Sequence, residues 1–490
     1  MVGCGRDGLV HRARPDRITC MDGSIQDLLR AIPSVQSLLA DGAIAELVDR
    51  YGRRPVVAAL RRAVSNLRGQ IIAKMVLPMG PCEIRQDLIR AARALLEEGF
   101  RPYYCRAINA TGIILHTGLG RAVLAKVALE QIQQTLQGYS ILQVDRQTGK
   151  RSRRDERIEW LLQQLTGAEA ATVVNNNAAA TAIVLNTIAK GKEVIVSRGQ
   201  LVEIGGSFRL PEVMAFSGAR LVEVGTTNKT HPYDYERAIT DDTVAIMRVH
   251  PSNYRIQGFT EEVPLERLVQ IAHSHNLVMI DDLGAGALID LGQFGFEPEP
   301  LIADSIRAGA DIVTCSGDKL IGACQAGLIM GRKDLIEAIR RNQFARIVRP
   351  GKLTLAVLES TLRLFLDEHV AVEQIPTYQM LTRRPEELAR SAESIMSAIV
   401  SMGLAADVST RPGQSEMGSG SLPAQGLATT LVAIRPRRIS VDELARRLRL
   451  HRIPVFARIA NGEVLIDPRT LQQGEDQLVV EAVAEALRTA

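Results

Sequence analysis

The spacing of apolar residues changes along this 490-residue chain and predicts three kinds of structure. From about residue 24 to 75, apolar positions recur every three or four residues, which is the period of an amphipathic helix. Between about 106 and 375, short β-branched runs alternate with helical segments. Beyond residue 376, strand-like and helical segments are mixed. The chain is therefore expected to fold as several regions of different class.

The alternating region predicts an α/β domain with a mostly parallel sheet and helices on both faces. Its candidate strands are ATVV, EVIVS, RLVEVG, TVAIMRVH, LVMIDD, DIVTCS and GLIMG. The final region predicts a smaller α+β domain with strands ATTLVAIRP and EVLIDP. We expect a disordered lead at 1–23, a helical domain at 24–100, a large α/β domain at 101–375 and a small domain at 376–490.

Composition narrows the class of protein. The chain is 46% hydrophobic and 23% charged, as in ordinary soluble globular proteins. Its net charge of +4 argues neither for nor against a nucleic-acid partner. Six cysteines without CxxC spacing favour reduced thiols in a cytoplasmic protein over a disulfide framework or a metal site. No apolar run reaches the roughly 20 residues of a membrane span, and we expect no signal peptide.

The segment RRPVVAALRRAVSNLRGQIIAK predicts a helix with a basic side. Arg54, Arg61 and Arg68 recur every seven residues, so they fall on one stripe of that helix. Such a stripe is either a solvated helix face or a contact for a polyanion. The pattern alone leaves both open.

Ligands of open α/β sheets bind at the carboxyl ends of the strands, and a polar turn follows one predicted strand there. Asn175, Asn176 and Asn177 lie between the strand ATVV and an alanine-rich helix. The N-terminus of a helix offers free backbone N–H groups to a phosphate. An asparagine there can equally be a plain helix cap.

Two further strand ends carry charged residues. Asp281 and Asp282 end LVMIDD, where a carboxylate is costly unless it meets a positive partner. Lys319 follows DIVTCS, 37 residues after Asp282 (319 − 282), which is the length of one crossover. In this order, a phosphate seat, an aspartate and a lysine suit pyridoxal phosphate, with the aspartate on the pyridine nitrogen and the lysine as Schiff base. A desolvated lysine loses its proton readily. The alternative is a loop lysine paired with Asp318.

Longer stretches of the chain resemble one enzyme family. They include INATGIILHTGLGRA, TGAEAATVVNNNAAA, VHPSNYRIQGFTEEV, DDLGAGALIDL and SGDKLIGACQAGLIMGRKDLI. These resemble the bacterial selenocysteine synthases, the L-seryl-tRNA(Sec) selenium transferases, which are pyridoxal phosphate enzymes of fold type I. The resemblance covers nearly all of the chain beyond the lead. It implies conversion of L-seryl-tRNA(Sec) to L-selenocysteinyl-tRNA(Sec) with selenophosphate, through a cofactor-bound dehydroalanyl-tRNA intermediate.

The resemblance also implies roles for single residues. Lys319 carries the cofactor and moves the proton at Cα, Asp282 pairs with the pyridinium, and the turn Asn175–Asn177 holds the cofactor phosphate. Arg121, Arg346 and Arg349 match the family's anion-binding set, and guanidinium groups grip phosphates with two hydrogen bonds. From the residues alone, Arg346 and Arg349 are equally a solvated helix end.

The remaining implications concern partners. The helical domain, with Arg54, Arg61 and Arg68, is expected to dock on tRNA(Sec), and the enzyme to form a homodecamer, a ring of dimers. Because the substrate carboxyl is esterified, no arginine is required to clamp it, which leaves the role of Arg458 open.

The chain departs from the family's motifs at three positions near the expected site: Gly118 replaces an asparagine, Gln200 a glutamate, and Cys324 lies in GACQAG where GGPQAG is usual. None of these departures replaces a residue to which a catalytic or binding role is assigned. They are expected to affect how the substrate fits, and not cofactor binding.

Two other functions fit parts of the sequence. One is a pyridoxal phosphate-dependent β-eliminase or ammonia-lyase of the same fold that acts on a free amino acid or an amino sugar acid. The other is a catalytically silent RNA-binding protein. Retention of Lys319 and Asp282 disfavours the second, and the helical N-terminal domain disfavours the first.

Overall fold

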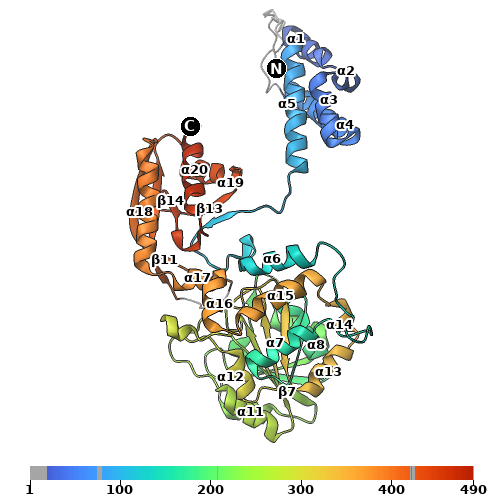
Figure 1. The fold of residues 1–490 in the computed structure, drawn as a ribbon, viewed down its shortest axis with the longest axis vertical. Coiled ribbons are helices and arrows are strands. Elements are labelled where there is room, and N and C mark those ends of the chain that lie inside the picture. Colours follow the sequence, from blue (N-terminus) through green and yellow to red (C-terminus); the bar gives the residue numbers. More distant parts are fainter. Residues whose placement is uncertain (1–18, 74–79, 207, 420, 422–424, 489–490) are drawn as a thin grey trace, which may run out of the picture. The chain divides into compact units, whose positions relative to one another are not determined.

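The computed structural model describes residues 19–73, 80–206, 208–419, 421 and 425–488, with side chains from residue 25 onward. The chain divides into two compact units, Met1–Cys105 and Arg106–Ala490, which are described separately (Figure 1). Most of the lead that we expected to be disordered, 1–18, lies outside the described residues. Residues 19–23 of that lead are helical and form the start of α1 (Thr19–Ala31). Adding residues to a helix that already exists costs little free energy, and this segment contains no proline to stop it.

The first unit is a set of packed helices, as the apolar period predicts. They are α1 (Thr19–Ala31), α2 (Val35–Leu39), α3 (Gly42–Tyr51), α4 (Arg53–Ile72) and α5 (Pro81–Phe100). Their apolar faces share one core that includes Leu38, Ile44, Leu60 and Leu88. Asp41 caps α3 through the backbone N–H of Ala43 and also accepts a hydrogen bond of 2.9 Å from Arg85 of α5.

The second unit contains a seven-stranded sheet in the order β2-β10-β9-β8-β7-β3-β6. Its strands are β2 (Ala170–Val174), β3 (Glu193–Ser197), β6 (Arg220–Val224), β7 (Thr243–Val249), β8 (Val278–Gly284), β9 (Ile312–Ser316) and β10 (Gly327–Gly331). Strand β10 is antiparallel to both of its neighbours, and the other pairs are parallel. All seven predicted strands are present, which confirms the mostly parallel α/β domain.

Helices cover both faces of this sheet, because its buried strands are apolar on both sides. Val194 and Val196 of β3 point to a cluster with α8 (Asn177–Ile188), α9 (Leu210–Ser217) and α13 (Lys333–Arg341). Ile195 lies between them and packs on the other side with α10 (Pro232–Ala238) and α11 (Leu265–Ser274). On that same side α7 (Glu156–Thr166), α12 (Ile302–Arg307) and α15 (Lys352–Leu364) pack against β9 and β10.

A smaller five-stranded sheet has the order β1-β13-β14-β12-β11. Its strands are β1 (Ile108–Ala110), β11 (Ala406–Ser415), β12 (Leu427–Pro436), β13 (Val455–Ala460) and β14 (Glu463–Ile466). Helices α18 (Pro385–Ser401), α19 (Val441–Leu450) and α20 (Glu475–Arg488) share its core. Strand β1 corrects the expected boundaries, because it pairs with β13 and so joins this sheet rather than the large one. Three residues are too few to show a strand period in the sequence.

The second unit also contains several shorter elements. They are α6 (Lys126–Thr135), α14 (Phe344–Ile347), α16 (Glu368–Gln374), α17 (Pro376–Thr382), the hairpin strands β4 (Glu203–Ile204) and β5 (Phe208–Arg209), and the 3-10 helices η1 (Thr117–Leu119), η2 (Arg198–Gln200), η3 (Leu291–Phe294) and η4 (Pro468–Thr470). In the described part of the chain no helix is both long and apolar enough to span a membrane.

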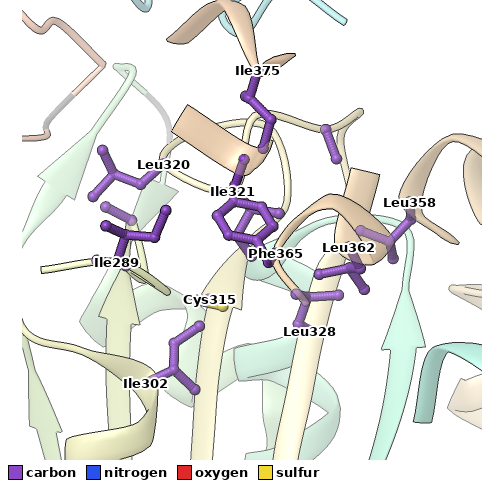
Figure 2. Packing of buried hydrophobic residues seen from close by; sticks show 14 of the residues in the cluster. Ile289, Ile302, Cys315, Leu320, Ile321, Leu328, Leu358, Leu362, Phe365 and Ile375 are labelled. Atoms are coloured by element: carbon purple, nitrogen blue, oxygen red, sulfur yellow. The ribbon is translucent and has the colours of Figure 1, made fainter. Parts of the chain in front are cut away.

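The loop after β9 is anchored in the core on both sides of its polar residues. Cys315 precedes the Ser-Gly-Asp-Lys turn, and Leu320 and Ile321 follow it; all three are fully buried. Figure 2 shows these three side chains in one apolar cluster with Leu328 and Phe365. Apolar burial on both sides therefore fixes where the lysine of the turn lies.

Candidate active site

A cavity of about 280 Å³ opens where β7, β8 and β9 end. Five residues singled out from the sequence line it: Arg121, Asn176, Asn177, Asp282 and Lys319. They come from four separate segments of the chain, so the sheet brings them together as the strand-end rule predicts. Its volume is close to the lower end of the range of small-molecule sites, about 300–1,000 Å³.

Lys319 is almost fully buried, with 4% of its surface exposed. Burial lowers the pKa of its amine, and the nearby guanidinium of Arg121 lowers it further. The carboxylates of Asp318, Asp282 and Glu299 act in the opposite direction. The balance favours an amine that gives up its proton, which a nucleophilic or basic lysine requires. The alternative interpretation is a loop lysine paired with Asp318. The structure pairs Asp318 with Arg121 instead, at 2.6 Å.

The two consecutive aspartates of β8 have different environments, because neighbouring strand residues point to opposite faces. Asp281 takes two hydrogen bonds of 2.7 Å from the guanidinium of Arg248. Asp282 accepts from the side chains of Asn177 at 2.8 Å and Thr181 at 3.0 Å. No ion pair among the described residues includes Asp282, and burial raises the pKa of its carboxyl. Asp282 is therefore the carboxylate that suits a cationic ligand group.

The asparagine turn supplies a helix cap and a cavity wall. The side chain of Asn176 accepts the N–H of Ala179 at 2.8 Å, which makes it the N-cap of α8. Asn177 and Asn176 line the cavity, whereas Asn175 is exposed and its backbone N–H donates to Val348. A side chain at Gly327 would meet the carbonyl oxygen of Asn176 at 2.2 Å, so the turn lies directly on β10.

The sequence of the chain matches a known family over most of its length. The family described as L-seryl-tRNA selenium transferase matches residues 107–472, and the one described as selenocysteine synthase N terminal matches residues 29–68. The chain belongs to the L-seryl-tRNA selenium transferase family. The transferase of Desulfomicrobium baculatum is 46% identical over 469 residues, which are 94% of this chain and 100% of that one. The transferase of Alkaliphilus oremlandii is 43% identical over 460 residues, 93% of this chain and 98% of that one.

Solved structures show the same fold at lower identity. D-Glucosaminate-6-phosphate ammonia-lyase superposes with a TM-score of 0.55 at 22% identity, covering 81% of this chain and 98% of that chain. This likeness is one of fold. The selenium transferase chain is a pyridoxal phosphate-dependent enzyme of fold type I, with a helical region at its N-terminus.

The cavity of the selenium transferase fits pyridoxal phosphate. It combines a deprotonation-prone Lys319, an Asp282 carboxylate without a cation and the N-terminus of α8. Two buried atoms that line it, Asn177 Oδ1 and Ser252 Oγ, have no hydrogen-bond partner among the described residues. Because buried polar groups are normally paired, such atoms mark where a ligand completes the network.

The three arginines expected to bind an anion are not gathered in the cavity of one chain. Arg121 lines the cavity. It follows Gly120 in a tight turn and has a positive φ of 64°. Arg346 and Arg349 are exposed and lie outside the cavity lining. They lie close enough to Arg154 for their charges to lower the pKa of its guanidinium, after the larger effect of burial. Val348, which lies between Arg346 and Arg349, nevertheless contacts the asparagine turn, because its carbonyl accepts the backbone N–H of Asn175 at 2.9 Å.

Four polar residues of the cavity were missed from the sequence: His250, Ser252, Ser316 and Gln325. His250 is the last residue of the predicted strand TVAIMRVH and Ser252 follows it closely, so the strand-end rule could have found both. Ser316 is the last residue of β9. Gln325 follows the turn and carries no pattern of its own.

The family departures lie around the cavity rather than in it. The buried Gln200 accepts the backbone N–H of Val249 at 3.1 Å and so supports the end of β7. Cys324 donates to the carbonyl of Thr354, and burial raises the pKa of its thiol to about 12. A side chain at Gly118 would meet the imidazole of His116 at 3.3 Å. None of the three lines the cavity.

Proposed function

We propose that this chain converts L-seryl-tRNA(Sec) to L-selenocysteinyl-tRNA(Sec), with selenophosphate as the selenium donor. Support comes from the two transferases above, which match over 93–94% of the chain. The observation that carries the proposal is the buried Lys319, which shares a cavity with Asp282 and is biased toward the uncharged amine.

The cavity residues then take defined roles. Lys319 would hold the cofactor covalently, Asp282 would hold its ring nitrogen, and the start of α8 with Asn176 and Asn177 would hold its phosphate. When bound, the cofactor draws electrons away from Cα of the seryl group. Lys319 would also be the base that takes the Cα proton, because it lines the cavity and deprotonates readily.

Arg458, whose role the sequence leaves open, is tied into the small sheet. Its guanidinium donates to the carbonyl of Gln414 at 3.0 Å and to Asp467 at 3.3 Å. Its buried Nε has no hydrogen-bond partner among the described residues.

The decisive experiment compares three substrates with the purified, cofactor-loaded enzyme. We expect selenium transfer to seryl-tRNA(Sec) when selenophosphate is supplied, and no turnover of free L-serine or of D-glucosaminate 6-phosphate. Turnover of a free substrate alone would favour the β-eliminase or ammonia-lyase alternative. Binding of tRNA without any turnover would favour the silent RNA-binding protein.

Selenophosphate is proposed to bind through Arg121, Arg346 and Arg349. Arg346→Ala or Arg349→Ala should raise the KM for selenophosphate by about tenfold, the loss of one charge-assisted contact, and leave cofactor binding unchanged. Arg438→Ala, an exposed arginine of the small domain, is the matched control. Unchanged selenophosphate kinetics in both variants would refute the role.

The first unit is proposed to bind tRNA(Sec) through Arg54, Arg61 and Arg68. All three are exposed on α4, on the side away from its buried Leu60 and Leu67. Reversing their charges should weaken tRNA binding and reduce its salt slope by about one per lost phosphate contact. The control variant reverses Arg390, Arg438 and Arg449, which are exposed in the second unit. It changes the net charge by the same amount and should leave tRNA binding and its salt slope unchanged. Equal effects would mean that the stripe is only a solvated face.

Two finer expectations complete the proposal. We propose that the enzyme acts in the cytoplasm and assembles as a homodecamer, a ring of dimers. Light scattering after gel filtration should give ten times the mass of one chain. A stable monomer or dimer would contradict the assembly.

A further inference from the structure

A histidine and a buried glutamate form a pair at the cavity that the roles above do not use. His250, directly after β7, lines the cavity, and its Nε2 lies 3.4 Å from Oε2 of Glu299. The Glu299 side chain is 5% exposed and that of His250 is 26% exposed. The backbone N–H of His250 also donates to the carbonyl of Asp282 at 2.9 Å, which fixes the residue beside β8. The pair is thus built into the site.

The distance between the two side chains allows Glu299 to orient the imidazole. A ring whose Nε2–H points at a carboxylate leaves Nδ1 as the nitrogen that exchanges a proton with the cavity. The charged groups around it come from four other segments: Asp282 from β8, Lys319 and Asp318 from the loop after β9, Arg121 from the turn after η1, and Glu299 from the segment before α12. The charge of Glu299 also reaches the amine of Lys319. His250 and Lys319 therefore belong to one electrostatic group.

The proposed reaction needs a second proton transfer that Lys319 does not supply at the same time. Lys319 takes the proton from Cα of the seryl group, and the C–H electron pair becomes the Cα=Cβ bond. The Cβ–O bond breaks with its electron pair on oxygen. Hydroxide is a poor leaving group, so the oxygen requires a proton as it departs. Of the other acid–base side chains that line the cavity, Asp318 is bonded to Arg121 and Asp282 is assigned to the cofactor ring, which leaves the imidazole of His250 as the proton donor.

We propose that His250 protonates the departing β-hydroxyl, so that it leaves as water, and that Glu299 is the positioning residue that aims the imidazole. This inference rests on the proposed function, because only a substrate with a β-hydroxyl needs the proton. His250 is left neutral and regains its proton from solvent once the water has gone. The overall change is loss of one water from the seryl group.

The test varies the leaving group. Wild type and His250→Gln, both loaded with cofactor, are compared on seryl-tRNA(Sec) and on the same tRNA carrying 3-chloroalanine, whose chloride needs no proton. We expect His250→Gln to lose about 10²–10⁴-fold on the seryl substrate, the usual contribution of a general acid, and to stay within about fivefold of wild type on the chloroalanyl substrate. Equal losses on both substrates, or no loss on either, would overturn the proposal.

Two outcomes separate this inference from the function on which it rests. If wild type fails on seryl-tRNA(Sec), the proposed function falls and the inference falls with it. If wild type works but the leaving group does not rescue His250→Gln, only the inference falls. Absorbance titration with pyridoxal phosphate should give His250→Gln an affinity within about twofold of wild type; a larger loss would make His250 a cofactor-holding residue instead.

The role of Glu299 has a readout that needs no turnover. In the cofactor-free protein, ¹⁵N NMR of the His250 ring should show the proton of the neutral form on Nε2, with Glu299 as acceptor. Glu299→Ala should move a measurable fraction of it to Nδ1, and Glu299→Gln, which keeps an acceptor oxygen, should restore Nε2. An unchanged tautomer in Glu299→Ala would show that Glu299 does not aim the ring.

Discussion

Two clusters of buried polar side chains in the second unit differ in how far the chain itself satisfies them. The closed cluster lies in the small domain and is defined by Ser415, Thr429, Asp467 and Arg469. Asp467 accepts from Ser415 at 2.8 Å, from Thr429 at 2.9 Å and from the backbone N–H of Arg469 at 3.0 Å. The guanidinium of Arg469 donates to Ser415 and to the carbonyls of three further residues, Met380, Arg383 and Ala428.

The open cluster lines the cavity and is left incomplete. Atoms without a hydrogen-bond partner in the described part of the chain include Asn177 Oδ1, Ser252 Oγ, Arg121 Nε and Asp318 Oδ1. Asp282 and Asp467 are both buried, with 3% and 0% of their surface exposed, yet of these two only Asp467 forms an ion pair with an arginine among the described residues, Arg458 at 3.3 Å. The open cluster contains one ion pair, Arg121 with Asp318, but its Asp282 has no ion-pair partner in the described part of the chain.

The difference separates stability from binding. A buried polar group without a partner costs about 1–3 kcal/mol, so the open cluster weakens the empty fold. The closed cluster joins β11, β12, η4 and α17, and Asp467 packs so tightly on Gly112 that a side chain there would meet its carboxylate at 2.0 Å. The unpartnered atoms of the open cluster can form their hydrogen bonds with a ligand, so this cluster suits binding rather than stability.

The largest expected effect is on the open cluster. Lys319→Ala should reduce turnover of seryl-tRNA(Sec) by at least about 10³-fold, since it would remove the amine proposed both to anchor the cofactor and to take the Cα proton. Rates are measured under single-turnover conditions, and thermal unfolding should be nearly unchanged. Lys333→Ala, an exposed lysine at the start of α13, is the control. If Lys319→Ala kept its activity, the open cluster would not be the active site.

The next effect falls on the closed cluster. Asp467→Ala removes the acceptor of Ser415, Thr429 and the guanidinium of Arg458, together with the negative charge that acts on the buried guanidinium of Arg469. It should lower the free energy of unfolding by about 3–5 kcal/mol. Urea denaturation of the cofactor-free protein measures the change. A loss below about 1 kcal/mol would mean that the closed cluster is not what stabilises the small domain.

A pair of fully buried serines compares the clusters directly. Ser415→Ala removes hydrogen bonds to Asp467 and Arg469 and should cost about 1.5–3 kcal/mol. Ser252→Ala removes a buried hydroxyl without a partner, so it should not destabilise the cofactor-free protein and should stabilise it by up to about 1–3 kcal/mol. The same urea titration serves both. Equal costs would show that the two clusters are satisfied alike.

The smallest effect concerns pH. Burial raises the pKa of Asp282 in the folded protein, so the folded state is most stable below the pKa of the unfolded chain, about 3.9, and loses stability as pH rises through the folded pKa. Asp282→Asn removes the charge, and Thr181 can rotate its hydroxyl to keep a hydrogen bond. We therefore expect the cofactor-free variant to be more stable than wild type at pH 8, with a gap that narrows toward pH 4. A gap independent of pH would contradict the raised pKa.

Elements with a strong local pattern could be predicted from the sequence. The seven strands of the large sheet are apolar runs bounded by turns, and α4 shows a clear helical period. Strand β1 was missed because its three residues gain their burial from β13, about 350 residues away in the chain. Such long-range pairing leaves no local trace.

The site divides in the same way. Lys319 and Asp282 could be placed because each ends a recognisable strand and such ends meet at one edge of a sheet. Glu299 lies in the irregular segment FEPEP, where no period predicts which way a side chain points. Arg346 and Arg349 came from resemblance, and their place outside the cavity of one chain could not be derived from spacing.

The central claim is that one buried amine holds pyridoxal phosphate. The most direct measurement is borohydride reduction of the cofactor-loaded protein, followed by digestion and mass spectrometry of the peptides. We predict a single pyridoxylated lysine, Lys319, in the peptide that contains SGDK. Modification of a different lysine, or of none, would contradict the account.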